Sequence, residues 1–204
     1  MSFISAYIYD IGMARFEKAC LKHWRRELLE DAHGDVLEIG AGTGASIEHY
    51  SDRVTKLVLT EPDQHLRRLM RSRISGKGVD TLQISDGTAE HMSAEDESLD
   101  CVVAFLVCCS VANLRTTLEE MRRVLKTGGH FVFLEHVAAT EGTARRRWQN
   151  RLTPLSRTMG YCHLNRETEE AIIRAGFKMK EIKRESVHQA LLTRQTIRGI
   201  AEKA

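Results

Sequence analysis

The fold of this chain follows from the stretch Asp35-Val36-Leu37-Glu38-Ile39-Gly40-Ala41-Gly42-Thr43-Gly44. Its apolar residues make a run of strand length, which then breaks into glycines at alternate positions. Such a strand, followed by glycine-rich turn chemistry, is typical of the first β-to-α junction of a doubly wound sheet. Glycines let the backbone turn tightly and approach a ligand, and a following helix would present free N–H groups to it.

The acidic residue in this stretch narrows the class of ligand. Gly40, Gly42 and Ala45 also fit the glycine pattern of dinucleotide-binding proteins, which is a weak signal by itself. Glu38 precedes the first glycine by two residues, and its carboxylate would repel a pyrophosphate. A cationic ligand such as S-adenosylmethionine, with its amino and sulfonium groups, would be attracted instead.

A second carboxylate stands where a nucleoside would need one. Glu61 follows the next apolar run and lies 21 positions after Gly40. An acidic residue at this place can accept hydrogen bonds from both ribose hydroxyls. NAD and S-adenosylmethionine share this requirement, so Glu61 predicts a ribose and leaves the reaction open.

Composition and charge set limits on the class of protein. The 204 residues suit one domain, and no apolar run reaches the roughly 18–20 residues that cross a bilayer. The odd number of cysteines, five, indicates a reduced, cytoplasmic protein without a disulfide framework. Formal charge is −5 over residues 1–140 and +7 over 141–204. No aromatic residues interleave the basic stretches, so we expect no nucleic-acid partner, whereas peripheral contact with a membrane stays open.

Strand and helix signals alternate along the chain from residue 35, which predicts a parallel sheet with right-handed crossovers. The expected strands are Val36–Ile39, Lys56–Thr60, Thr81–Ser85, Leu99–Val107, His130–Glu135, Phe177–Ile182 and Gln195–Ala201. The expected helices are Ser46–Tyr50, Gln64–Ser72, Leu114–Lys126, which Thr127-Gly128-Gly129 would stop, and Arg166–Ala175.

The domain organisation is predicted as a single domain, 1–204, in three parts. Residues 1–34 carry apolar residues at helical spacing and form an N-terminal helical cap, which could pack on the domain, cover the crevice with Tyr7 and Tyr9, or rest on a membrane. Residues 35–140 form the cofactor-binding core. Residues 141–204 contain the last two strands and a long insertion, 142–166, placed where a substrate lid is expected.

The ordered motifs resemble those of class I S-adenosylmethionine-dependent methyltransferases. The resemblance rests on the glycine stretch, Glu61, Ser98-Leu99-Asp100-Cys101-Val102-Val103 and Arg123-Val124-Leu125-Lys126-Thr127-Gly128-Gly129. It implies an α/β fold with a doubly wound, Rossmann-like, seven-stranded sheet of order 3-2-1-4-5-7-6, strand 7 antiparallel, and helices on both faces.

A closer likeness is to the methyltransferase-like thiol S-methyltransferases. It is carried by Phe105-Leu106-Val107-Cys108-Cys109-Ser110-Val111, Glu135-His136-Val137-Ala138, Arg147-Trp148-Gln149-Asn150 and Leu164-Asn165-Arg166-Glu167-Thr168. That likeness implies a small-molecule thiol as acceptor. Phospholipid N-methyltransferases and quinone-precursor C-methyltransferases are similar mainly over the cofactor half, and they remain alternatives.

The resemblance also implies the residues that hold S-adenosylmethionine. The methionine part would lie on Glu38, Gly40, Ala41, Gly42 and Gly44, and the ribose on Glu61 beside Pro62. The adenine would lie along Gly87, Thr88, Ala89 and Glu90, with Asp86 as a further candidate, while Phe105 and Leu106 would border the transferring methyl group.

The candidate catalytic residue is His136, because it follows strand five and the carboxyl ends of strands face the crevice. Glu135 could orient it or point the other way, and Ser110 and Asn113 could hydrogen-bond an acceptor or serve as turn residues. Adjacent Cys108 and Cys109 lack C-x-x-C spacing, and Cys162 and His163 stand in a distant segment, so we expect no metal site.

Three hypotheses of function follow. The first is a methyltransferase acting on a small molecule, preferably a thiol. The second is a module that binds the cofactor without transfer, since no general base is beyond dispute. A nicotinamide-dependent dehydrogenase is the third, and Glu38 argues against it. The oligomeric state is left open.

Overall fold

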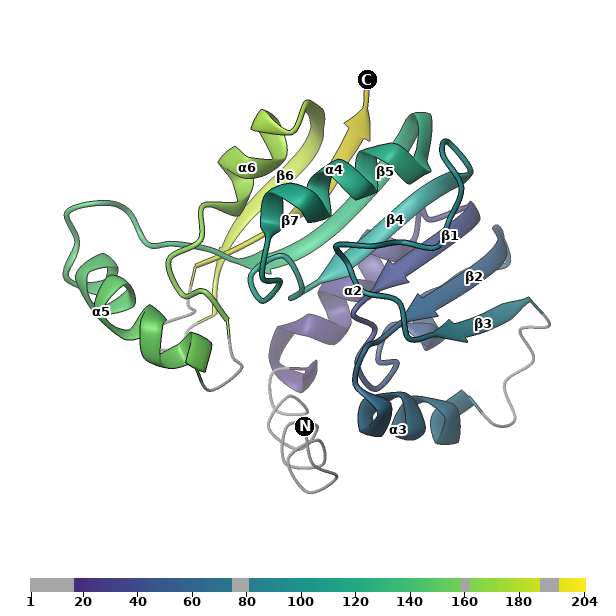
Figure 1. Ribbon diagram of the computed structural model, residues 1–204, viewed down its shortest axis with the longest axis horizontal. Coiled ribbons are helices and arrows are strands. Elements are labelled where there is room, and N and C mark those ends of the chain that lie inside the picture. The colour runs from purple at the N-terminus through teal and green to yellow at the C-terminus, as the bar shows by residue number, and fades with distance from the viewer. Residues whose placement is uncertain (1–16, 75–80, 159–161, 188–194) are drawn as a thin grey trace.

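The computed structural model describes residues 17–74, 81–158, 162–187 and 195–204, and within them the chain forms one mixed sheet (Figure 1). The strand order is β3-β2-β1-β4-β5-β7-β6, and β7 runs antiparallel to both of its neighbours, which confirms the predicted topology. The strands are β1 Gly34–Ile39, β2 Val54–Thr60, β3 Leu82–Ser85, β4 Leu99–Phe105, β5 Leu125–His136, β6 Phe177–Ser186 and β7 Gln195–Lys203.

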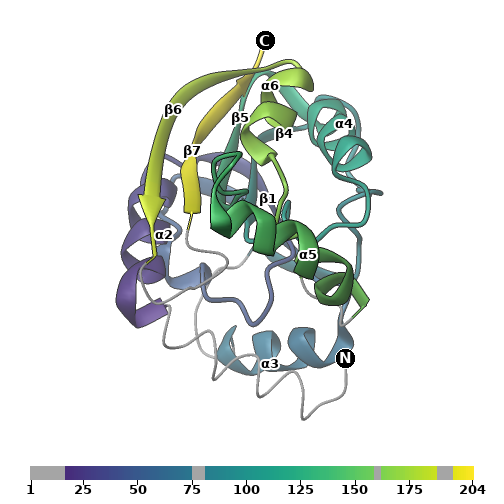
Figure 2. The ribbon, with the colours of Figure 1, turned by 90° about the vertical axis from the view of Figure 1, so that its left-hand side faces the viewer.

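Helices cover both faces of the sheet, as predicted. Figure 2 shows α4 and α6 on one face and α2 on the other, while α5 and α3 lie towards the carboxyl ends of the parallel strands. The helical segments are η1 Glu17–Leu21, α2 Lys22–Leu29, η2 Ile47–His49, α3 Gln64–Ile74, α4 Leu114–Val124, α5 Ala144–Thr158 and α6 Thr168–Arg174.

The hydrophobic core has two parts, one on each face of the sheet, because the central strands carry apolar side chains on both faces. On β1, Leu37 and Ile39 pack towards α4 and α6, whereas Val36 packs with Leu29 of α2 on the opposite face. The alternation follows the period of a strand, which sends successive side chains to opposite sides. A strand buried on both faces reads as a continuous apolar run, as β4 does.

Two predicted helices differ from the structure. The helix expected at Ser46–Tyr50 is only the short 3-10 turn η2, because Ser46 and Tyr50 both donate side-chain hydrogen bonds to Glu38 and the chain is extended at Tyr50. Helix α4 ends at Val124, before the expected glycine stop, because Leu125 is extended and pairs with Leu99 as the start of β5.

The insertion after residue 141 is more ordered than its sequence suggested. It holds α5, with Pro154 inside the helix, and this helix was not predicted. The N–H of Ala138, just after the end of β5, donates a hydrogen bond at 3.0 Å to the carbonyl of Arg166, the last residue of the insertion. The insertion is therefore anchored at the carboxyl end of β5, close to the predicted crevice.

The predicted N-terminal cap falls partly within the described residues. Of it, α2 packs its buried Leu28 and Leu29 against the sheet, so this part of the cap is a packing element. Tyr7 and Tyr9 lie outside the described residues. No helix in the described part of the chain has the length and apolar character needed to cross a membrane.

This description of the core predicts that two helical leucines contribute very differently to the free energy of unfolding. Leu118 of α4 is 1% exposed and Leu155 of α5 is 58% exposed. We expect Leu118→Ala to lower the free energy of unfolding by about 2–5 kcal/mol, because it removes buried methyl groups and leaves a cavity. The control Leu155→Ala should change it by less than about 0.5 kcal/mol. Urea titration followed by circular dichroism measures both, and equal losses would contradict this description of the core.

Candidate active site

The turn after β1 is built on glycines in the left-handed backbone region, but they differ in their surroundings. A Cβ added at Gly40 would come within 2.6 Å of Val107 Cγ2, and one at Gly44 within 2.6 Å of Ile47 Cδ1. Gly42 has φ of +58°, and an added Cβ would meet no described atom within 4 Å. Gly40 and Gly44 therefore allow close packing, whereas Gly42 presents bare backbone to open space.

Glu61 lies against the same turn. Its side chain is buried, and its two carboxylate oxygens accept hydrogen bonds from the backbone N–H groups of Gly42 at 3.0 Å and Asp63 at 2.9 Å. Burial raises the pKa of Glu61, and these backbone donors oppose the rise. Ala41 joins the two strand ends, because its N–H donates to the carbonyl of Thr60. The predicted ribose carboxylate and the glycine turn thus form one unit.

Glu38 is the most enclosed of the predicted cofactor residues. It is 2% exposed, and its carboxylate accepts hydrogen bonds from Ser46 Oγ at 2.7 Å and Tyr50 OH at 2.9 Å. Burial raises the pKa of Glu38, and the charge of Arg25 acts in the opposite direction. Arg25 Nη1 donates to Ser46 Oγ at 3.0 Å, and its guanidinium lies 5.0 Å from the centre of the Phe105 ring.

Sequence reasoning missed Arg25. The available signal was a basic residue at an otherwise apolar position, since Arg25 follows Leu21, the N-cap of α2, at helical spacing and precedes Leu28, and all three are buried. A buried arginine normally has a structural or functional partner. Here it joins α2 to the carboxyl ends of β1 and β4.

The stretch predicted to lie along the adenine is more exposed to solvent than Glu38 and Glu61. Pro62 and Thr88 are exposed, Gly87 is half-buried and Ala89 is buried. Glu90 is engaged elsewhere, because its Oε1 accepts hydrogen bonds from the backbone N–H groups of Ala112 at 3.0 Å and Asn113 at 3.4 Å. Glu90 therefore connects the turn after β3 to the start of α4.

The end of β4 carries backbone strain. Leu106 has φ of +61°, a conformation that residues with a Cβ rarely adopt. Its N–H donates to the carbonyl of Leu134 at 2.7 Å, which holds the residue against the end of β5. Strained residues of this kind cluster at functional sites. Leu106 and the adjacent buried Phe105 lie at the strand end that the sequence predicted would border the methyl group.

Glu135 is directed to the loop after β4 and not to His136, which is one of the two orientations that the sequence left open. Its fully buried carboxylate accepts hydrogen bonds from three backbone N–H groups, of Val107 at 2.8 Å, Cys108 at 2.8 Å and Cys109 at 3.0 Å. Burial raises the pKa of Glu135 to about 6, against the effect of these donors. Glu135 fixes the path of the loop after β4.

The predicted catalytic residue, His136, lies with two cysteines. It is 5% exposed, and its Nε2 has no hydrogen-bond partner within the part of the chain that the structure describes. A ring nitrogen of His136 and the Sγ atoms of Cys109 and Cys162 lie within 4.8 Å of one another. Contact with the Cys109 thiol, followed by contact with His136, lowers the pKa of Cys162 to about 4. The expectation that Cys162 stands apart from Cys109 is therefore wrong.

Hydrogen bonds from the insertion hold Cys162 in this place. The N–H of His163 donates to the carbonyl of Cys109 at 2.8 Å. Arg166 Nη1 donates to the carbonyls of Cys108 at 2.6 Å and Val111 at 2.8 Å. The segment after α5 thus lies directly on the loop after β4, and sequence separation hid this contact.

Of the two polar residues suggested for acceptor binding, Asn113 caps a helix and Ser110 lies beside the cysteine sulfurs. Asn113 is the N-cap of α4, since its Oδ1 accepts a hydrogen bond from the N–H of Thr116 at 3.2 Å. Ser110 Oγ lies 3.5 Å from the Sγ atoms of both Cys109 and Cys162. Of the two residues suggested for acceptor binding, Ser110 is the one beside His136 and the sulfurs.

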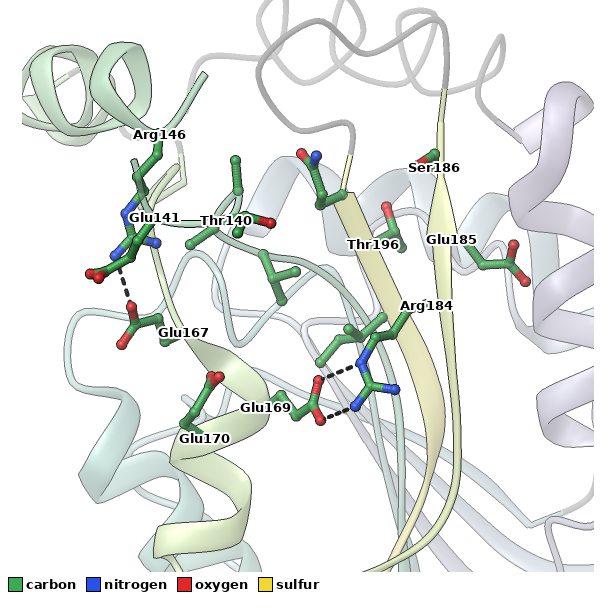
Figure 3. Close-up of a pocket in the computed structure, with 15 residues that line it drawn as sticks. Thr140, Glu141, Arg146, Glu167, Glu169, Glu170, Arg184, Glu185, Ser186 and Thr196 are labelled. Atoms are coloured by element: carbon green, nitrogen blue, oxygen red, sulfur yellow. Dashed lines mark hydrogen bonds and ion pairs between the residues drawn. The ribbon is translucent and has the colours of Figure 1, made fainter. Parts of the chain in front are cut away.

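A separate cavity of about 420 Å³ begins just after His136 in the chain (Figure 3). Charged side chains line it and pair with one another, with Arg146 Nη2 2.8 Å from Glu167 Oε1 and Arg184 bound to Glu169. Apolar side chains, among them Val137 and Ile197, contribute to its lining as well.

A sheet of this order, with a bare glycine turn after β1 and a buried carboxylate after β2, defines the class of Rossmann-like methyltransferases. Residues 37–133 match the family model of the methyltransferase domain. Human thiol S-methyltransferase TMT1A is 35% identical over 175 residues, which cover 83% of this chain and 70% of that protein. The chain belongs to the family of S-adenosylmethionine-dependent methyltransferases.

Two further comparisons agree with this assignment. Rat thiol S-methyltransferase TMT1B is 36% identical over 145 residues, which make up 70% of this chain and 59% of that protein. This chain therefore matches well under two thirds of the rat relative's length. The solved structure of geranyl diphosphate methyltransferase in complex with SAM has a TM-score of 0.72 at 15% identity, over 94% of this chain and 87% of that one. At this identity the likeness concerns the fold.

The loop held by Glu135 gives a prediction about stability. We expect Glu135→Ala to lower the free energy of unfolding by at least about 3 kcal/mol, because each buried amide that loses its acceptor costs about 1–3 kcal/mol. Glu135→Gln has nearly the same shape and keeps one carbonyl acceptor, so its loss should be smaller. Chemical denaturation of both variants checks this, and equal stabilities would show that the three hydrogen bonds contribute little.

Proposed function

We propose that this protein transfers the methyl group of S-adenosylmethionine to the sulfur of a small thiol. The observation that carries the proposal is the close sequence relationship to proteins named thiol S-methyltransferases, which extends well beyond the cofactor half of the chain. The site supports it with open space over Gly42 and a cluster of His136 and sulfur atoms at the neighbouring strand ends.

The cofactor would lie across the carboxyl ends of β1, β2 and β4. The bare backbone at Gly42 fits a ligand that approaches closely, since a side chain there would occupy its space. Glu61 would accept the ribose hydroxyls through the lone pairs that its two backbone donors leave free. Glu38 would attract the cationic methionine part, and the adenine would follow Gly87–Glu90 beside Pro62.

The chain's own part in the reaction would be alignment, shielding and activation of the acceptor. Bound S-adenosylmethionine supplies a methyl group already activated on a sulfonium, so the protein chiefly positions an in-line displacement. Phe105 and Leu106 would exclude water from the transferring methyl group. A free thiol has a pKa of about 8.5, so a modest effect yields the nucleophilic thiolate. His136, whose Nε2 has no partner among the described residues, would act on that sulfur.

Gly42 offers a direct test of the cofactor position. We expect Gly42→Val to abolish binding of S-adenosylhomocysteine in isothermal titration calorimetry, because the side chain would fill the ligand's space. Gly128→Val is a matched control, since Gly128 also has positive φ, +78°, and no described atom within 4 Å of an added Cβ. Both variants carry the same backbone strain, about 1–2 kcal/mol. Wild-type affinity in Gly42→Val would refute the placement.

The acceptor is tested with labelled S-adenosylmethionine and a panel of compounds analysed by product mass. We expect labelled thioethers from alkyl or aryl thiols, and no labelled product from phosphatidylethanolamine or quinols. Labelled phospholipid or quinol without thioether would move the assignment to nitrogen or carbon. Stabilisation of the fold by S-adenosylhomocysteine without product from any acceptor would identify a binding module instead.

A further inference from the structure

We propose that Cys109, His136 and Cys162 bind a zinc ion whose fourth position takes the acceptor thiol as a thiolate. This inference rests on the proposed function, because the thiol is the substrate assigned there. It assigns to the buried cysteines and to His136 a single joint task, which the sequence had given no reason to expect.

The donor set suits zinc. Two thiolate sulfurs and one imidazole nitrogen are soft and borderline ligands of the kind that zinc prefers, and catalytic zinc sites use three protein ligands with one open position. Around a tetrahedral zinc, such donor atoms lie roughly 3.5–3.8 Å apart. The three donor atoms here already lie within 4.8 Å of one another, so small side-chain rotations would complete the geometry.

The burial of the cluster gives a second, independent observation. Cys109 is fully buried and His136 is 5% exposed, yet none of the described residues offers a hydrogen-bond partner to Nε2 of His136. A buried polar atom without a partner is costly, and native proteins rarely leave one without a reason. A metal ion bound through Nε2 would satisfy this nitrogen. Ser110 Oγ, 3.5 Å from both sulfurs, is placed to donate a hydrogen bond to a metal-bound thiolate.

The three ligands are held by parts of the fold that do not depend on the ion. The N–H of Cys109 donates to the carboxylate of Glu135, and its carbonyl accepts from His163. The carbonyl of Cys162 accepts a hydrogen bond from Ser156 Oγ of α5 at 2.8 Å. His136 is the last residue of β5 and pairs with Thr196 of β7. The site is therefore preorganised, as metal sites on rigid elements need to be.

The fourth position can be reached from outside. Cys162 is half-buried and Ser110 is exposed, so one side of the cluster is accessible, while the other side meets the buried strand ends. Among the described residues, the three ligands have no fourth His, Cys, Asp or Glu grouped with them. An arriving thiol would therefore meet an open coordination position and not a closed structural site.

The chemistry balances without any oxidant or reductant. The thiol R–SH binds zinc as R–S⁻, and its proton goes to solvent, because coordination deprotonates a thiol. A lone pair of that sulfur forms the new S–CH₃ bond while the CH₃–S⁺ bond of S-adenosylmethionine breaks, and its electron pair stays on the cofactor sulfur. The products are a neutral thioether, which leaves zinc, and neutral S-adenosylhomocysteine.

The test uses the full chain, stripped of metal under reducing conditions and titrated with Co²⁺ as a spectroscopic probe. We expect one cobalt per chain, with thiolate-to-cobalt charge-transfer absorption and the strong visible bands of four-coordinate cobalt. Loss of these bands is expected in Cys162→Ser and in Cys109→Ser. Cys108→Ser should keep them, and it is a matched control because Cys108 is also fully buried but lies outside the cluster.

The wild-type titration decides the matter even where a variant fails to fold. Cobalt that binds without thiolate absorption, or fails to bind, would overturn the proposal, as would the same spectrum in folded Cys162→Ser. A Cys109–Cys162 disulfide that persists in place of metal binding under the reducing conditions would overturn it as well.

A second titration separates this inference from the proposed function. Adding a small alkyl thiol to the cobalt-loaded chain should shift the visible bands and add charge-transfer intensity, and a dialkyl thioether should not. A thiol-dependent shift without methylated product would support the site while refuting methyl transfer. Thiol methylation that proceeds at full rate in metal-stripped protein, with chelator present, would refute the zinc role while supporting the proposed function.

Discussion

Three backbone N–H groups of the loop after β4 donate hydrogen bonds to one buried carboxylate, that of Glu135. A carboxylate with good acceptor geometry is a strong partner for amides, and here it replaces the strand ladder at the point where β4 and β5 separate. These hydrogen bonds fix the backbone conformation of the loop from Val107 to Cys109. In that conformation Cys109 faces His136, and the carbonyls of Cys108 and Cys109 become acceptors for the insertion.

The cofactor side of the crevice depends on a similar arrangement of buried charge. Glu38 is surrounded by the hydroxyls of Ser46 and Tyr50, with Arg25 behind them. Buried charges are tolerated when they are paired and hydrogen-bonded. This network connects α2, the turn after β1 and the end of β4, so that the N-terminal helix fixes the position of the crevice wall.

Much of the sheet could be predicted because its signals are local. Apolar runs ending in turn residues marked the strands, and the glycine turn with Glu61 marked the nucleoside side of the crevice. Two helix predictions were wrong in extent because tertiary contacts override the local helix propensity of those segments. The Ser46–Tyr50 segment follows its hydrogen bonds to Glu38, and Leu125 leaves α4 to pair with Leu99.

By itself, the sequence determined the fold class, the strand order through the family resemblance, the glycine turn after the first strand and the carboxylate of Glu61 after the second. These depend on residues that are close in the chain or follow a regular period. Only the tertiary structure decided that Cys162 meets Cys109 and His136, because Cys162 lies more than 50 residues from Cys109 in the chain and belongs to a different segment from His136. No periodicity records such a contact, since it arises when the insertion folds back onto the loop after β4.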